Sequence, residues 1–65
     1  MSLEDDIARQ AFHVEQLEAE EKILKQLLKE CHGSRLRLFH RALEDVQYEI
    51  KASTKTFKAL VAKLI

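Results

Sequence analysis

The stretch KECHGSRLR, residues 29–37, contains the only glycine of a 65-residue chain that has no proline. Glycine takes left-handed backbone conformations easily and is common just after the end of a helix. Ser34 follows Gly33, and serine is a preferred N-cap at the start of a helix. The chain therefore either reverses direction here or continues as one long helix, in which Gly33 would cost about 1 kcal/mol.

The residues before the glycine have the spacing of a coiled-coil helix. Apolar side chains recur at alternating intervals of four and three residues, and Ser2 with Asp5 matches a helix N-terminus. Seven of the nine positions in this row are apolar. The first row comprises Leu3, Ile7, Gln10, Val14, Leu17, Glu21, Leu24, Leu28 and Cys31. We therefore expect a first helix over residues 3–31.

The residues after the glycine carry a second row with the same spacing. The row comprises Leu36, Phe39, Leu43, Val46, Ile50, Ser53, Phe57, Leu60 and Leu64, and all of these nine residues except Ser53 are apolar. This row starts one residue later than an unbroken continuation of the first row would place it. The change of phase coincides with Gly33 and favours a turn at 32–35 and a helix over 36–65. Residues 53–56, STKT, are weak helix formers, and we expect local fraying there.

The two rows match layer by layer if the chain folds back on itself. Cys31 then faces Leu36, and each later pair follows in register as far as Leu3 with Leu64. A four-residue connection suits a helical hairpin. We predict an all-α fold over residues 1–65, an antiparallel two-helix coiled-coil hairpin. Its expected core comprises Leu24, Leu28, Phe39, Leu43 and Ile50. The alternative is a continuous helix in a parallel coiled coil.

A second apolar stripe lies outside the two rows and is a candidate association surface. It comprises Phe12, Ala19, Ile23, Leu27 and Leu38. A chain this short buries only about 60% of its unfolded surface, so a single core is marginal. We therefore expect two hairpins to pack as a homodimeric four-helix bundle. The simpler interpretation is that these are scattered surface apolar residues.

Basic residues gather near the expected turn. Residues 25–42 contain five basic residues against one acidic residue. The candidate basic tip comprises Lys29, Arg35, Arg37 and Arg41. Arg35 and Arg37 fall in the first turn of a helix, where the helix dipole disfavours cations. They either stay solvated and balance the acidic middle of a neighbouring copy, or they contact an acidic partner surface or a phosphate.

The sequence carries no signature of catalysis, of a metal site or of cofactor binding. Cys31, His32 and His40 are the only cluster with ligand potential, and a fourth ligand for structural zinc is missing. The net charge is zero, so no nucleic-acid partner is expected. The longest apolar run is too short to span a bilayer. Lysines flank an apolar face in residues 51–65, as in interfacial membrane helices, but that face also completes the second row.

These patterns predict a non-enzymatic coiled-coil module for protein–protein interaction and oligomerisation. Its expected partner is itself or another helical protein, and the lone thiol favours an intracellular, cytoplasmic location. The alternative is an effector- or adaptor-type hairpin that binds a folded partner, such as a small GTPase, through its flank or its basic tip. In shape the expected hairpin resembles the antiparallel coiled-coil fingers of Rho-type GTPase effectors, which is an analogy of architecture.

Overall fold

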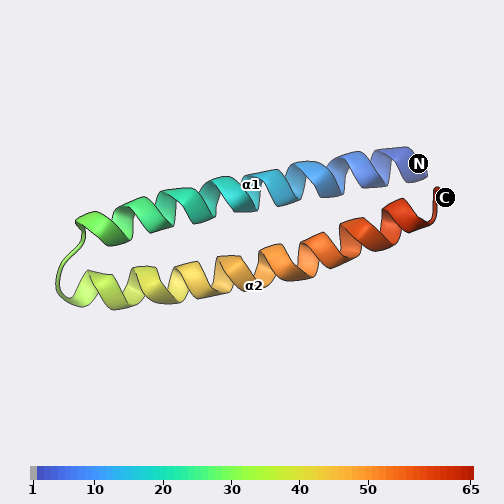
Figure 1. Ribbon diagram of the computed structural model, residues 1–65. Coiled ribbons are helices and arrows are strands. Elements are labelled where there is room, and N and C mark those ends of the chain that lie inside the picture. The colour runs from blue at the N-terminus through green and yellow to red at the C-terminus, as the bar shows by residue number, and fades with distance from the viewer. Residues whose placement is uncertain (1) are drawn as a thin grey trace.

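A computed structural model, which describes residues 2–65, shows a hairpin of two helices (Figure 1). Helix α1 spans Leu3–Glu30 and helix α2 spans Ser34–Ala62. The helices lie side by side and antiparallel, with the connection at one end and both termini at the other (Figure 1). The resulting rod measures 49 × 16 × 14 Å. The predicted all-α architecture of two helices packed against each other is confirmed.

The connection differs in detail from the expected turn at 32–35. Helix α1 ends where Cys31 becomes extended, with φ −90° and ψ 146°, while its N–H still donates to the Leu27 carbonyl at 2.9 Å. Gly33 has the expected positive φ of 81°, with ψ −145°. It is the N-cap of α2, which therefore starts at Ser34 and not at residue 36. The positive φ thus serves the entry into α2, because α1 has already ended three residues earlier, at Glu30.

The start of α1 follows the expected capping pattern. The Ser2 hydroxyl accepts a hydrogen bond from the Asp5 backbone N–H at 3.2 Å. Glu4, Asp5 and Asp6 occupy the first turn, where negative charge is favoured by the helix dipole. Helix α2 has no side-chain cap and no acidic residue in its first turn, so its N-terminus is the less stabilised of the two.

The two rows of the sequence form the seam between the helices. All of their residues are at least partly shielded from solvent except Leu64, which lies beyond the end of α2 and is 54% exposed. The final layer predicted for Leu64 with Leu3 is therefore not closed. A hydrogen bond from Gln10 Nε2 to the Ser53 carbonyl oxygen, at 3.1 Å, crosses the seam. A helix carbonyl points toward the C-terminus, so the Ser53 oxygen lies near the level of Phe57, one turn later. The bond therefore fits the predicted layer of Gln10 with Phe57.

Burial along the seam is much shallower than the sequence led us to expect. Leu17, 5% exposed, is the only buried residue among those described. The residues expected to form the core are each only half-buried: Leu24, Leu28, Phe39, Leu43 and Ile50. Two helices touch along one line, so each seam side chain is covered from one direction and stays open along both flanks.

Residues 53–56 show no break in α2. Helix α2 runs without interruption to Ala62, and the Thr56 hydroxyl donates to the Ala52 carbonyl oxygen at 3.2 Å. The expected local fraying of STKT is therefore absent from this structure. A threonine inside a helix can bond its hydroxyl to the carbonyl oxygen four residues earlier. The weak helix propensity of the segment did not predict this local hydrogen bond.

Candidate interaction surface

The apolar stripe of α1 runs obliquely to the seam. At 100° per residue, Phe12 lies on the side of α1 opposite the seam, whereas Leu27 lies at the edge of the seam. The exposure follows this course, because Phe12 is 62% exposed and Ile23 is 60% exposed, whereas Leu27 is half-buried. Ala19 lies exposed between them. The stripe therefore approaches α2 only near the turn.

Helix α2 contributes to the same face at the point where the stripe reaches its edge. The register of the hairpin places Leu27 across from Ala42, and both are half-buried although neither belongs to the seam. Leu38 lies one helical turn before Ala42 and is 68% exposed. We call the four residues Ile23, Leu27, Leu38 and Ala42 the tip patch. It is an apolar surface built from both helices, close to the turn.

The predicted association residues therefore divide into two groups. Ile23, Leu27 and Leu38 belong to the tip patch, whereas Phe12 and Ala19 lie on the outer side of α1, away from α2. Phe12 and Ile23 are separated by about 16 Å along the helix axis. Ala42 could have been found from the sequence. Leu27 and Ala42 each directly precede a seam residue, and the predicted register places them opposite each other.

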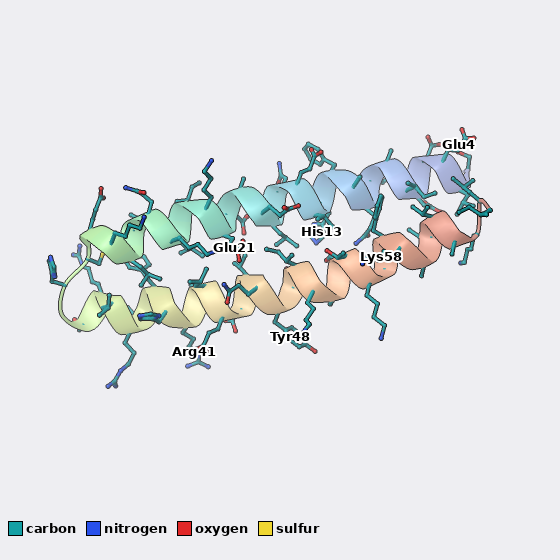
Figure 2. All side chains as sticks on the ribbon, viewed as in Figure 1. Glu4, His13, Glu21, Arg41, Tyr48 and Lys58 are labelled. Atoms are coloured by element: carbon teal, nitrogen blue, oxygen red, sulfur yellow. The ribbon has the colours of Figure 1, made fainter. Side chains whose placement is uncertain are left out.

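Tyr48 is a large exposed side chain that the predicted association residues did not include. It is 75% exposed, and it projects from α2 on the side away from α1 (Figure 2). It lies about 9 Å along the helix axis from Ala42, on the outer side of α2 and not on the flank that carries the tip patch. A tyrosine has an apolar ring and a polar hydroxyl, so its exposure alone marks no interface.

The predicted basic tip is exposed but does not form one cluster. Arg41 projects from α2 on the side away from α1 (Figure 2), and Arg37 lies one turn earlier on the same side. Arg35 lies on the flank that carries the tip patch, because it is seven residues, or two turns, before Ala42. Lys29 is on α1, and all four side chains are exposed. Arg35 is therefore the one basic residue of the tip that borders the tip patch.

Acidic residues border the tip patch on its other side. Glu20 lies seven residues before Leu27, and Glu49 lies seven residues after Ala42, so the two carboxylates are on the same flank of neighbouring helices. Among residues 2–65, the ion pair within 4 Å joins Lys25 to Glu21 at 3.8 Å, inside α1. Among the described residues, neither Glu20 nor Glu49 has a cationic partner. Arg35 likewise has no anionic partner among them.

The molecule exposes more surface than its mass requires. Its accessible surface is 5426 Å², whereas a folded monomer of 7.6 kDa typically exposes about 4,300 Å². The excess is about 1,100 Å². Part of this excess surface follows from the rod shape of the molecule. The excess means that more side-chain surface is in contact with water than in a typical folded monomer of this mass.

Within residues 2–65, no group of three or more His, Cys, Asp or Glu side chains is placed to hold a metal ion. Cys31 is a free, half-buried thiol, and His32 and His40 are exposed. Neither α1 nor α2 is long and apolar enough to cross a bilayer. Comparisons with protein-family models, with curated proteins and with solved structures gave no match to this chain.

Proposed function

We propose that this chain is a non-enzymatic interaction module that self-associates through the apolar side chains outside its seam. The observation that carries the proposal is the lack of a closed core. Leu17 alone is buried among the described residues, while the rest of the seam is open along its flanks. A second helical pair packed over a flank would cover seam side chains that the hairpin leaves open, as in four-helix bundles.

The magnitudes favour self-association over an isolated hairpin. Complete burial of a Leu or Ile side chain stabilises by about 1.5–3 kcal/mol. Ile23 and Leu38 are both more than half exposed, so covering them would contribute several kcal/mol. Small domains have a total stability of only about 5–15 kcal/mol. Covering two such side chains would therefore change the stability of this chain substantially.

Sedimentation velocity from low to high micromolar concentration tests this function. We expect the wild-type chain to be a dimer or a larger assembly, and the Ile23→Ser/Leu38→Ser variant to sediment as a monomer with lower helix content. Tyr48→Ser is the matched control, because it removes an exposed side chain on the side away from α1. A wild-type chain that is fully helical and monomeric throughout this range would contradict the proposal.

A second candidate function is the binding of a folded partner through the basic tip. Arg37 and Arg41 favour it, because they are exposed on one side of α2 and neither has an anionic partner among the described residues. An acidic protein surface, for instance that of a small GTPase, would complement them. Arg37→Gln/Arg41→Gln should then weaken binding to that partner without a change in sedimentation. If the same variant instead lowers self-association, these arginines serve the assembly and this candidate is wrong.

A further inference from the structure

We propose that two copies of this hairpin overlap only at their turn ends, antiparallel and staggered, with their tip patches face to face. The proposal rests on the self-association proposed above and specifies its geometry. The two-fold axis would pass between the tip patches at the level of Leu27 and Ala42. Each open end, which carries both termini, would then point away from the other copy.

The charges on the flank of α2 determine this register. Arg35, Ala42 and Glu49 are spaced by seven residues, so they lie on one side of α2 at intervals of two helical turns. Arg35 and Glu49 are therefore equidistant from Ala42, in opposite directions. A two-fold axis at Ala42 brings Arg35 of one copy opposite Glu49 of the second copy, and symmetry repeats the pair. Arg35 and Glu49 are both available for this pair, because neither has an ionic contact within the described hairpin.

The apolar residues fit the same axis. Leu27 of each copy would lie on the axis against its equivalent, and Ile23 and Leu38 would extend the contact on both sides. Ala42 has the small side chain that lets two helices approach closely at their crossing point. Arg35 and Glu49 would then border an apolar centre, which is the usual order of a protein interface, with an apolar core and a polar rim.

Full-length packing on this flank brings like charges together in both possible directions. If the turns lie at the same end, Glu20 of one copy meets Glu49 of the second, and four carboxylates gather at one level. If the turns lie at opposite ends and the rods overlap completely, Arg35 meets Lys63 and Glu49 meets its own equivalent. Like charges placed opposite each other disfavour an interface. The staggered overlap is the register that pairs opposite charges.

The staggered dimer has a distinctive length. The overlap from the turn to the level of Glu20 covers about 21 Å of helix. Two rods of 49 Å joined in this way span about 75 Å, whereas two fully overlapping rods span about 50 Å. Small-angle scattering of the dimer distinguishes these lengths. A maximum dimension near 50 Å would overturn the staggered arrangement while leaving self-association intact.

Exchange of the two charges tests the register directly. Arg35→Glu and Glu49→Arg, each alone, should weaken dimerisation about tenfold in sedimentation equilibrium, since two symmetric pairs are replaced by like charges. The double variant R35E/E49R should restore the wild-type dissociation constant. Neither single change harms the hairpin itself, because a glutamate suits the first turn of α2 and an arginine at 49 relieves the proximity of Glu20.

Arg41→Glu is the matched control, since it makes the same change in charge on the side of α2 away from α1, and it should leave the dissociation constant unchanged. Helix content from circular dichroism should be the same in all variants at a concentration at which each of them is dimeric. If R35E strengthens the dimer, the full-length antiparallel register is present, because R35E would then face Lys63. If the double variant stays as weak as the single ones, the proposed pair does not exist. A wild-type monomer would instead contradict the proposed function as a whole.

Discussion

Gly33 enables the reversal of the chain through its backbone, not through packing. Its φ of 81° combined with ψ of −145° is a region that L-amino acids with a side chain rarely occupy. A Cβ atom built at this position meets no other atom within 4 Å. The penalty for any L-residue at position 33 is therefore conformational strain alone, which makes the position suitable for a stereochemical test.

We predict that Gly33→Ala lowers the free energy of unfolding by about 1–2 kcal/mol, the usual cost of a strained backbone. A D-alanine at position 33, introduced by chemical synthesis, should instead match or exceed the stability of the wild type. These dihedral angles are the mirror image of an ordinary extended conformation. Urea denaturation measures the free energy of unfolding of both alanine variants. Equal stability of the two alanine forms would contradict the role assigned to Gly33.

Leu17 is the other residue on which the hairpin depends. Leu17→Ala should destabilise the fold by about 2 kcal/mol, at the lower end of the range for buried leucines, because a two-helix seam can partly collapse around the gap. Leu64→Ala is the control, since Leu64 is 54% exposed beyond the end of α2. Its effect should stay below about 0.5 kcal/mol. Thermal unfolding of both variants at one concentration provides the comparison.

At the scale of the helices, two serines in similar sequence positions have different roles. Ser2 caps α1 through its bond to Asp5, whereas Ser34 is already the first helical residue of α2 and its side chain makes no hydrogen bond with a described residue. Ser2→Ala should therefore cost about 1 kcal/mol, whereas Ser34→Ala should be nearly neutral. Helix content against temperature, measured by circular dichroism, tests both. A larger loss for Ser34→Ala would show that it is the true cap.

The sequence predicted the helices and their pairing because seam residues follow a strict periodicity. The match of Gln10 with Phe57, supported by the Gln10–Ser53 bond, came from spacing alone. The spacing could not show that Gly33 would cap α2, because both glycine and serine are acceptable at a helix N-terminus. It also could not show how shallow the burial is, since an apolar residue such as Leu24 satisfies the pattern whether one helix or three cover it.

The candidate surface was only partly predictable for a related reason. Phe12 and Leu27 belong to one stripe on α1, but the stripe is oblique to the seam, and only the position of α2 determines which part becomes a shared face. Ala42 joins that face through its position opposite Leu27. An alanine by itself does not predict an interface, so Ala42 is recognised only from its position in the register of the two helices.

For the whole molecule, self-association predicts that stability depends on protein concentration. A tenfold increase in concentration should add about 1.4 kcal/mol to the apparent stability of a dimer, so the melting temperature should rise by several degrees. Scanning calorimetry at a series of concentrations measures this shift. A melting temperature that does not change with concentration would show that the hairpin unfolds on its own.

Both ends of the chain emerge at the pole opposite the turn (Figure 1), and this has a practical consequence for fusion proteins. A domain joined at either terminus would stand about one rod length, 49 Å, away from the turn. In the staggered dimer, two such domains would be held at opposite poles, facing away from each other. The hairpin would then act as a spacer of fixed length that keeps its two cargoes apart while linking them into one particle.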